Sequence, residues 1–556
     1  MDGLPHLDQI VGGKGVSDTI KNAFQVKNKF LLTLISQRSI PEDGVNDVVI
    51  ENILSELSMM DSNNFIENAG VGEREARIFS PIVAKRHFYM GHGIGRSGDF
   101  FAPQPKAAGS SLLVKLTNYF ALDILHRRGF RCANNAIVLP LATGMCLTMV
   151  FLSLKSERPK AKYVITPRMD QKTCVKCIHA AGFIPCIVEN KLEGDEVRTD
   201  IQNLTKKIEE IGTENIVCVM SVSSCFAPRA PDRVGEISKL CDDYNIPHIV
   251  NNAYGLQSNK IMNMLEDSAR KGRVDAVVMS TDKNFLVPVG GTVLCSPLAP
   301  SKKAFSLRNP ISSSVPSASA SSTPSSSADV STPLSIVERV SNLFPGRANI
   351  SPLVDLFITL LSLGWKGYSD LCEKRKQLFV AMQERLKEVA GKHNERLLST
   401  PHNPISMAIS LSSFQSSPTQ QTDSGKGDIS EKSSETSSIE NASSSSAPST
   451  ALSTSAAVEK PTSSSSSEIT SIGSSLFLRC VSGCRTVDPL APPKKKFICE
   501  GVEMVSGFGS HLTRYPFPYL SCACAIGMSE NDVDLLCKRL DRVLTERERK
   551  ANKSDT

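Results

Sequence analysis

One lysine in this sequence stands where an amine could carry a cofactor. Lys283 follows a predicted buried strand, Ala276–Met279, and precedes Gly290 and Gly291. A lysine at the carboxyl edge of a sheet, backed by glycines, suits a Schiff base with pyridoxal 5′-phosphate (PLP). The alternative is an ordinary surface lysine in a turn, and these residues alone leave both interpretations open.

A second short stretch could bind the phosphate of such a cofactor. Residues 142–145, Ala-Thr-Gly-Met, lie between the predicted strand Ala136–Leu141 and a predicted helix. Backbone N–H groups at a helix N-terminus, together with the hydroxyl of Thr143, can hold a phosphate. Both stretches therefore predict one site at the carboxyl edge of a sheet.

The glycine-rich segment GHGIGRSGDF, residues 91–100, raises a competing interpretation. Gly93, Gly95 and Gly98 have the spacing of a dinucleotide-binding fingerprint. That fingerprint must follow a buried strand and open a helix. The preceding AKRHFYM is no buried strand and the following FFAPQP is no helix, so we expect no dinucleotide here.

Cys174 and Cys177, with His179 nearby, resemble half of a zinc or redox site. No second CxxC pair accompanies them, and the context after the strand Tyr163–Thr166 is helical. This pattern favours ordinary core or surface thiols, and we predict no metal site.

The elements that must position these residues alternate between short apolar strands and helices from about residue 130 onward. This alternation predicts an α/β domain with a mostly parallel sheet, covered on both faces. The expected strands are Ala136–Leu141, Tyr163–Thr166, Phe183–Val188, Ile216–Ser221, His248–Val250 and Ala276–Met279, and the expected helices include Thr199–Ile211, Gly235–Tyr244 and Leu256–Lys271.

Helical spacing of apolar residues predicts further helices over residues 16–60. After residue 350 we expect a smaller α+β domain. Its predicted elements are a helical region Leu353–His393, strand-like segments Ile405–Leu411, Leu476–Val481 and Tyr519–Ala525, and a last helix Glu530–Arg549. Residues 309–334 and 412–471 are rich in Ser, Thr, Pro and Ala, which predicts disordered insertions or, alternatively, a phosphorylated regulatory region.

Composition limits the class of protein. The chain has 556 residues, a formal net charge of +6 and 16 cysteines without a disulfide-framework pattern. The mild positive charge permits a nucleic-acid partner without demanding one. Neither a signal peptide nor an apolar run of membrane-spanning length is apparent, so we expect a cytoplasmic protein without a membrane anchor.

Longer runs resemble the O-phosphoseryl-tRNA(Sec):selenocysteinyl-tRNA synthase (SepSecS) family. The resemblance extends over nearly the whole folded chain and skips only the two Ser-rich insertions. The runs are VGEREARIFS, HGIGRSGDFFAPQPKAAGSSLL, PRMDQKTC, SCFAPRAPDR, PHIVNNAYGLQS, DKNFLVPVGG, FPGRA and ERLLSTPHNPISMA.

The resemblance implies a PLP enzyme of the aspartate-aminotransferase-like fold (fold type I), a homotetramer that forms selenocysteine on its tRNA with selenophosphate. It implies an oligomerisation segment over residues 1–60, a catalytic domain over 61–365 and a small domain over 366–550, before a tail of residues 551–556.

For the cofactor, the resemblance implies a covalent link at Lys283. It implies that Arg74 and Thr143 hold the PLP phosphate, that Gln171 packs on the ring, and that Asn251 faces the pyridine nitrogen. An Asn cannot keep that nitrogen protonated as an Asp does, so the electron sink should be weaker, which a good leaving group such as phosphate tolerates.

For the substrate, the resemblance implies that the phosphoseryl phosphate is bound by Arg96, Ser97, Gln104 and Arg347. Arginine, hydroxyl and amide donors suit a dianion. Glu73 would repel the carboxylate of free phosphoserine and tolerate the ester on tRNA.

For tRNA, the resemblance implies contacts from Arg270, Arg485 and Arg549. The chain departs from the family where it reads Gly-Cys-Arg over 483–485 instead of Gly-Ala-Arg, and where Arg549 replaces a lysine. Two other interpretations remain: a different enzyme of the same fold, which would need a different sequence over 93–109, and a tRNA-binding scaffold that has lost its chemistry.

Overall fold

The computed structural model describes residues 10, 14–96, 98–297, 334–414, 468–489, 497–499, 502–504 and 511–554. Ser97 and most of the two predicted Ser-rich insertions, 309–334 and 412–471, lie outside the described residues. At both edges of the second insertion the structure contradicts the predicted disorder: residues 412–414 form a 3-10 turn, and residues 468–471 are the beginning of a helix.

A seven-stranded sheet forms the centre of the molecule, in the order β1-β9-β8-β7-β6-β2-β3. Only β9 runs antiparallel to its neighbours β1 and β8, so the predicted mostly parallel sheet is confirmed. The strands are β1 (Ala133–Leu139), β2 (Tyr163–Pro167), β3 (Ile184–Val188), β6 (Ile216–Val222), β7 (His248–Asn251), β8 (Ala276–Ser280) and β9 (Thr292–Pro297).

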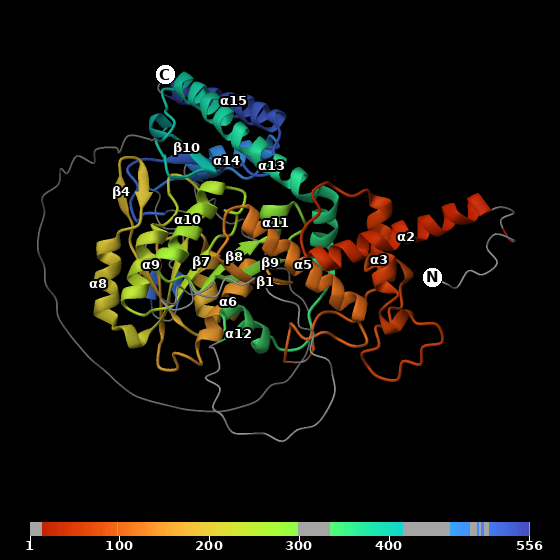
Figure 1. The fold of residues 1–556 in the computed structure, drawn as a ribbon. Helices are drawn as coiled ribbons and strands as arrows, with labels where there is room; N and C mark the ends of the chain where they lie inside the picture. The colour runs from red at the N-terminus through yellow and green to blue at the C-terminus, as the bar shows by residue number, and fades with distance from the viewer. Residues whose placement is uncertain are drawn as a thin grey trace, which may run out of the picture.

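Helices pack around this sheet in groups (Figure 1). α6 (Thr143–Leu154) contacts α7 (Lys172–Ala180) and α12 (Ile336–Leu343), whereas α9 (Val234–Asp243) contacts α8 (Ile201–Ile211) and α10 (Asn259–Lys271). β6, β7 and β8 are buried along their whole length, which explains why β6 and β8 are mostly apolar without alternation. β7 has a buried polar residue at each end, His248 and Asn251.

The helix α13 (Ser351–Lys392) connects the large body to the smaller one (Figure 1). It is kinked at Gly364, whose φ is +60°. A Cβ at this position would lie 2.4 Å from the backbone carbonyl carbon of Asp43, so only glycine fits. The first half of α13 packs on α5 (Ala108–Arg127), and its second half packs on α15 (Glu530–Ser554).

The smaller body contains an antiparallel sheet in the order β10-β14-β11, with α14 (Glu468–Leu478) and α15 beside it. Its strands are β10 (Ser406–Ser410), β11 (Arg485–Val487) and β14 (Tyr519–Ala523). The predicted strand Leu476–Val481 is wrong, because Leu476 lies in α14. Ile469, Ile472 and Leu476 are all buried, and their spacing of three and four residues is helical.

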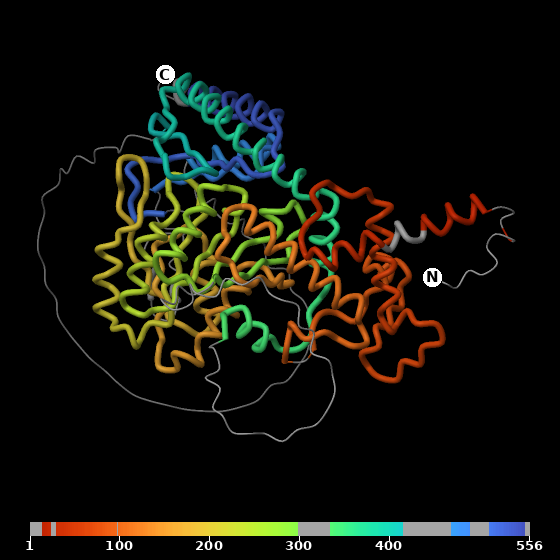
Figure 2. Tube along the Cα trace, in the orientation of Figure 1, coloured from red at the N-terminus to blue at the C-terminus, as the bar shows by residue number. Residues whose placement is uncertain are grey.

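Two N-terminal helices confirm the helical prediction for residues 16–60. They are α2 (Lys14–Gln37) and α3 (Asp47–Ser58), and the trace shows α2 projecting from the rest of the molecule (Figure 2). Asp61 anchors the end of α3 to α5, since its carboxylate accepts hydrogen bonds from the backbone N–H of Ser110, at 3.0 Å, and from the Ser110 hydroxyl, at 2.5 Å.

The remaining elements are short. They are α4 (Pro81–Arg86), α11 (Thr281–Phe285), the hairpin of β4 (Lys191–Glu193) and β5 (Glu196–Arg198), the hairpin of β12 (Phe497–Cys499) and β13 (Val502–Met504), and the 3-10 turns Ser62–Asn64, Thr213–Asn215 and Ser412–Phe414. Across the described ranges, no helix combines the length and the apolar character needed to cross a bilayer.

Candidate active site

Four of the predicted cofactor residues lie where strands of the large sheet end. Thr143 opens α6 after β1, Gln171 precedes α7 after β2, Asn251 ends β7, and Lys283 lies in α11 after β8. These four strands are parallel to one another, so their carboxyl ends lie at the same edge of the sheet. This edge is where open α/β sheets bind ligands.

Contacts between the loops hold these positions close together. The side-chain amide of Asn251 donates to the Sγ of Cys174 in α7, at 3.4 Å. The N-termini of α6 and α7 touch, because a Cβ on Gly144 would lie 2.4 Å from Cγ2 of Thr173. The hydroxyl of Thr292 donates to the carbonyl oxygen of Leu141 at 2.6 Å, and the N–H of Thr281 in α11 donates to the carbonyl oxygen of Gly291 at 3.0 Å. These two hydrogen bonds connect the residues before Thr143 and the helix of Lys283 to residues 291–292.

Lys283 lies in a short helix and not in the turn considered from the sequence. α11 ends at Leu286, which adopts a left-handed conformation with φ of 60°. The Nζ of Lys283 donates to the Oγ of Ser280 at 3.2 Å and lies 3.7 Å from Oδ2 of Asp282. The Lys283 side chain is 47% exposed, so its amine is accessible to a cofactor and a substrate.

Three buried polar atoms near this edge have no hydrogen-bond partner in the described chain: Oγ1 of Thr143, Oδ1 of Asn251 and the hydroxyl of Tyr254. Each unsatisfied buried group costs about 1–3 kcal/mol unless a ligand supplies its partner. A ligand with a phosphate, a ring nitrogen and a phenolic oxygen offers such partners. The residues at this edge therefore fit PLP.

Tyr254 was not predicted as a site residue. Tyr254 comes three residues after Asn251, in the run NNAYG that follows β7. This place, just after the carboxyl end of a buried strand, could have marked it as a site residue from the sequence. Burial raises the pKa of Tyr254 well above its usual value, so the phenol stays protonated and can donate a hydrogen bond.

Cys174 and Cys177 are buried free thiols in α7, which agrees with the prediction of ordinary thiols. Burial raises the pKa of Cys174 to about 12, so it is a poor nucleophile and a poor metal ligand at neutral pH. Within the described ranges, no group of three or more His, Cys, Asp or Glu residues is arranged to hold a metal ion.

The glycine-rich segment forms a loop that is attached to the FPGRA run. Ile94 pairs with Ala348 as an antiparallel bridge, and Gly93 has a φ of +74°. A Cβ on Gly93 would lie 2.6 Å from the carbonyl oxygen of Ala348, so glycine permits this close approach. The helix α4 precedes the loop and α5 begins only at Ala108, so the segment has neither the strand before it nor the helix directly after it that a dinucleotide fingerprint needs.

A pocket of about 620 Å³ lies beside this loop and contains Glu73, Arg74, His92 and Arg347. Arg347 donates from Nη1 to the carbonyl oxygen of His92 at 3.1 Å. The pocket is not lined by Thr143, Gln171, Asn251 or Lys283. Of the predicted cofactor residues, Arg74 is the one that lines this pocket, together with Arg347.

Two further residues predicted to bind the phosphoseryl phosphate follow Gly93, a lining residue of this pocket, along the chain. Arg96 is exposed in a tight turn, with its N–H donating to the carbonyl of Asp99 at 2.9 Å. Gln104 is nearly buried, and its backbone N–H donates to the Oγ of Ser111 at 2.9 Å. Ser97 lies outside the described residues.

The three arginines predicted to contact tRNA lie in three different elements. Arg270, 45% exposed, pairs with Glu266 at 2.5 Å near the end of α10, and Arg549 is exposed near the end of α15. Arg485 in β11 instead pairs with the buried Asp170, next to Gln171. Of the three, Arg485 is thus the one whose pairing joins it to the neighbourhood of a predicted cofactor residue.

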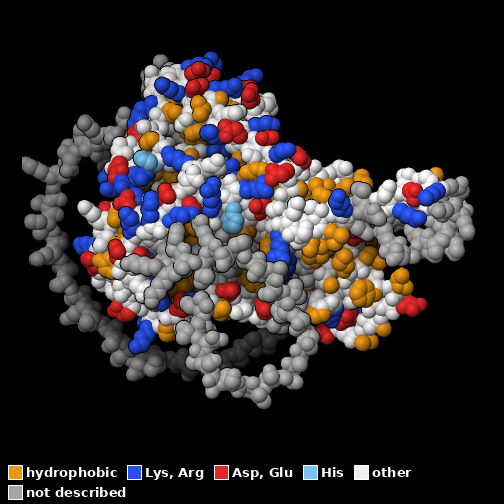
Figure 3. Space-filling model, in the orientation of Figure 1, with side chains coloured by type: hydrophobic (Ala, Val, Ile, Leu, Met, Phe, Trp, Pro, Cys, Tyr) orange, Lys and Arg blue, Asp and Glu red, His pale blue; other side chains and the backbone are white. Residues whose placement is uncertain are grey.

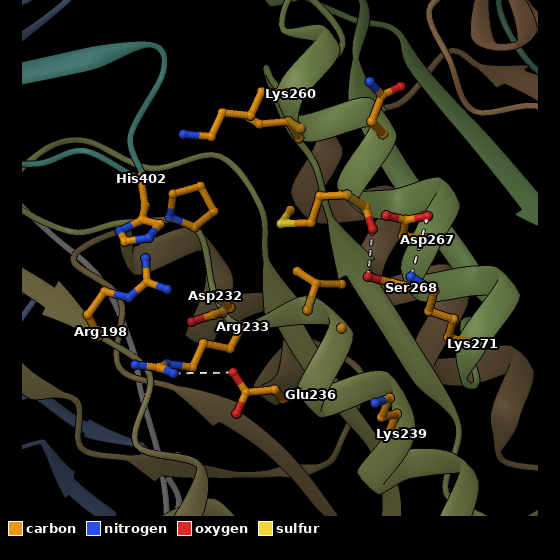
Figure 4. A pocket seen from close by; sticks show the side chains of 16 residues that line it. Arg198, Asp232, Arg233, Glu236, Lys239, Lys260, Asp267, Ser268, Lys271 and His402 are labelled. Atoms are coloured by element: carbon orange, nitrogen blue, oxygen red, sulfur yellow. Dashed lines mark hydrogen bonds and ion pairs between the residues drawn. The ribbon is translucent and has the colours of Figure 1, made fainter.

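Another pocket of about 620 Å³ lies between α9 and α10 (Figure 4). Basic side chains surround it, among them Lys239, Lys260 and Lys271. Acidic side chains are interspersed, since Arg233 pairs with Glu236 at 3.2 Å (Figure 4). None of the predicted site residues lines this mixed surface.

The fold and the site together define a PLP-dependent enzyme of fold type I. The family profile for O-phosphoseryl-tRNA(Sec) selenium transferase, SepSecS, matches residues 60–327, 311–432 and 426–545. The chain belongs to the O-phosphoseryl-tRNA(Sec) selenium transferase family, which confirms the resemblance found in the sequence.

Relatives match over nearly the full length. The O-phosphoseryl-tRNA(Sec) selenium transferase of Dictyostelium discoideum is 40% identical over 542 residues, 97% of this chain and 98% of the relative. The protein of the same name from Caenorhabditis elegans is 35% identical over 530 residues, 95% of this chain and 92% of the relative. The crystal structure of an archaeal SepSecS superposes with a TM-score of 0.71 at 27% identity, covering 95% of this chain and 97% of the other.

Proposed function

We propose that the protein converts O-phosphoseryl-tRNA(Sec) to selenocysteinyl-tRNA(Sec), with PLP as cofactor and selenophosphate as selenium donor. The observation that carries the proposal is the accessible amine of Lys283, at the sheet edge where Thr143 and Asn251 present unpartnered polar atoms. The full-length similarity to proteins named for this activity supports the substrate.

Each residue of this site would bind a different part of the cofactor. Thr143 and the N-terminus of α6 would hold its phosphate, Gln171 would pack on its ring, and Asn251 would face its ring nitrogen. When bound, PLP withdraws electrons from the Cα of an amino acid whose amine it holds. A neutral Asn251 keeps this withdrawal modest.

The overall reaction would take three steps: loss of phosphate from Cβ, addition of selenium to Cβ, and hydrolysis of the Se–P bond. The amine of Lys283 takes the proton from Cα, and phosphate leaves Cβ with the electron pair of the C–O bond. The selenium of selenophosphate then bonds to Cβ while Lys283 returns a proton to Cα. Water finally cleaves the Se–P bond, which releases the second phosphate.

Ser280 and Asp282 would prepare Lys283 for proton transfer. The hydroxyl of Ser280 donates to the carboxylate of Asp282 and accepts from the Nζ of Lys283, at 3.2 Å for the latter. The carboxylate, 3.7 Å from Nζ, would stabilise the ammonium form that follows proton abstraction.

The group around the glycine-rich loop would recognise the phosphoserine. Arg96, Ser97, Gln104 and Arg347 would bind its phosphate, since arginine N–H groups match phosphate oxygens in pairs. Arg74 would help to hold the phosphate of the cofactor. Glu73, exposed in the pocket with Arg347, would repel the carboxylate of free phosphoserine and so select the ester.

The macromolecular partners are tRNA(Sec) and further copies of the chain. Arg270, Arg485 and Arg549 would contact the tRNA in a cytoplasmic enzyme, and the protein would act as a homotetramer. Support for the assembly comes from apolar side chains gathered over the N-terminal region (Figure 3). Exposed apolar residues of this region include Val48, Met59, Phe65, Ile66, Val71, Phe79 and Ile82.

Phosphate release from O-phosphoseryl-tRNA(Sec) tests the proposal. We expect the PLP-loaded enzyme to release phosphate, and the Lys283→Ala variant to release none above background. The control is the same tRNA carrying unphosphorylated serine. Equal release by wild type and Lys283→Ala would contradict the assignment.

A further inference from the structure

Arg485 has a partner that constrains what it can do. Its Nη1 donates to Oδ2 of Asp170, a carboxylate that is 4% exposed, whereas the Arg485 side chain is 34% exposed. The guanidinium carbon also lies 4.1 Å from the centroid of the Phe226 ring. The arginine is therefore held on one side by charge and on one face by an aromatic ring.

Asp170 depends on Arg485 to balance its charge. His511 lies 3.6 Å from Oδ2 of Asp170, but burial lowers the pKa of His511 to about 4, so it is neutral at physiological pH. Among the described residues, Arg485 is then the cation in direct contact with Asp170. The buried Arg229 also attracts Asp170, but its ion pair is with Asp232. A move of Arg485 toward an RNA phosphate would leave a buried charge unpaired, which is strongly unfavourable.

The pairing nevertheless leaves Arg485 able to bind a ligand. An arginine has five N–H donors, and the contact with Asp170 uses Nη1. The other oxygen of Asp170, Oδ1, is buried without a partner in the described chain. In a purely structural ion pair, both side chains would be buried and both carboxylate oxygens would accept hydrogen bonds. Here Arg485 is partly exposed, and Oδ1 of Asp170 accepts no hydrogen bond from the described chain.

The pair also joins two parts of the cofactor site. Asp170 is followed directly by Gln171, which precedes α7. Phe226 meets the ring of Tyr254 edge to face, with the centroids 6.2 Å apart. Arg485 thus belongs to the small body, yet it rests on the neighbours of two cofactor-side residues.

We propose that Asp170 is a positioning residue for Arg485, holding the guanidinium on Phe226 so that it meets the acylated end of the RNA from a fixed place beside the cofactor ring. Without Asp170, Arg485 would be a mobile surface cation that binds any RNA phosphate. The inference rests on the proposed function, because it takes Arg485 as a tRNA contact.

The Asp170→Asn variant separates positioning from general attraction. With the PLP-loaded enzyme, we expect the affinity for uncharged, non-cognate tRNA to rise about three-fold and its salt dependence to steepen by about 0.7–0.9 in the log–log slope. Turnover of O-phosphoseryl-tRNA(Sec) should fall by about ten-fold or more. Unchanged RNA affinity and slope in the folded variant would overturn the proposal.

The Arg485→Met variant tests whether Asp170 acts through Arg485. The double variant should match Arg485→Met alone within about two-fold, in both RNA binding and turnover, because no guanidinium remains for Asp170 to position. Additive effects of the two substitutions would overturn the proposal. Asp534→Asn serves as a matched control, since it frees Arg385 of an exposed pair in the small body, and its turnover should stay within about two-fold.

A second variant keeps the test decisive if Asp170→Asn does not fold. Phe226→Leu removes the ring under Arg485 and changes no charge. We expect KM for O-phosphoseryl-tRNA(Sec) to rise about five- to ten-fold, with non-cognate RNA affinity unchanged. An unchanged KM would overturn the proposal. Turnover by the wild-type enzyme is measured in the same assay. A wild type that shows no turnover would contradict the proposed function itself and not the role of Asp170.

Discussion

Asn251 donates its side-chain amide to the Sγ of Cys174 at 3.4 Å, and this contact leaves its Oδ1 without a partner in the described chain. The contact joins the end of β7 to α7 and fixes the orientation of the amide at the site. A neutral side chain here suits a reaction in which phosphate is the leaving group, because a good leaving group needs less electron withdrawal from the cofactor.

Asn251→Ala should weaken PLP binding. Removing the amide takes away one oriented polar contact, worth about 1–3 kcal/mol, so the affinity should fall roughly ten-fold. Titration of the apoenzyme with PLP, followed by visible absorbance, measures the change. Asn263→Ala, an exposed asparagine in α10, should bind PLP as the wild type does. Equal affinities of Asn251→Ala and wild type would count against this placement of the ring.

Lys283→Ala should abolish the visible absorbance of the bound cofactor and reduce turnover by about a thousand-fold or more, since both the covalent link and the proton transfer are lost. Absorbance spectra and single-turnover assays measure these effects. Lys271→Ala, at an exposed lysine of α10, is the control and should keep both properties. A normal spectrum in Lys283→Ala would show that another lysine carries the cofactor.

Glu73→Gln should let free phosphoserine react. The substitution removes the negative charge that would repel the substrate carboxylate, while the side chain keeps its shape. Phosphate release from free phosphoserine, compared with release from O-phosphoseryl-tRNA(Sec), measures the selectivity. If Glu73→Gln rejects free phosphoserine as the wild type does, Glu73 is not the filter.

The buried His248 should make stability depend on pH. Burial lowers its pKa to about 4, while an unfolded histidine titrates near its usual value of about 6.5. Between these values the unfolded state binds more protons, so stability is lost as the pH falls, by about 2–3 kcal/mol by about pH 4.5.

Thermal unfolding of wild type and His248→Gln, from about pH 7 to about pH 4.5, measures this contribution. Gln lacks the titrating ring, so the variant should show the smaller loss of stability over this range. Parallel curves for the two proteins would mean that His248 is protonated in the folded state as easily as in the unfolded state.

Deletion of residues 415–467 should leave catalysis within about two-fold of wild type, because this Ser-rich composition cannot bury much apolar surface. The deletion keeps Ser413, whose N–H and hydroxyl both donate to Oε1 of Glu395, and it keeps α14 from its start at Glu468. Activity and oligomeric state of the shortened protein measure the effect. A large loss of activity in a folded protein would contradict the prediction.

The large sheet could be predicted from the sequence because its strands are covered on both faces. β6 is entirely buried, so it appears as an apolar run of strand length, interrupted only by Ser221. β7 is equally buried, although only Ile249 and Val250 of its four residues are apolar. Once the strands are predicted, their carboxyl ends are predicted as well, and Thr143 and Lys283 lie just after such ends. The short helix around Lys283 could not be predicted, because five residues give no helical period.

The small body was harder to predict from its sequence. The end of α14 was mistaken for a strand because Leu476, Phe477 and Leu478 form a short apolar run, and such runs fit either structure. The partners of Arg485 could not be predicted either. Asp170 and Phe226 are distant from it in the chain, and sequence spacing carries no information about such contacts.

Formation of selenocysteinyl-tRNA(Sec) tests the central claim most directly. The PLP-loaded enzyme is incubated with O-phosphoseryl-tRNA(Sec) and selenophosphate, and the aminoacyl group is identified by mass spectrometry. We predict selenocysteine on the tRNA from the wild type, and unchanged phosphoserine from Lys283→Ala. Unchanged phosphoserine with well-folded, PLP-loaded wild-type enzyme would contradict the account.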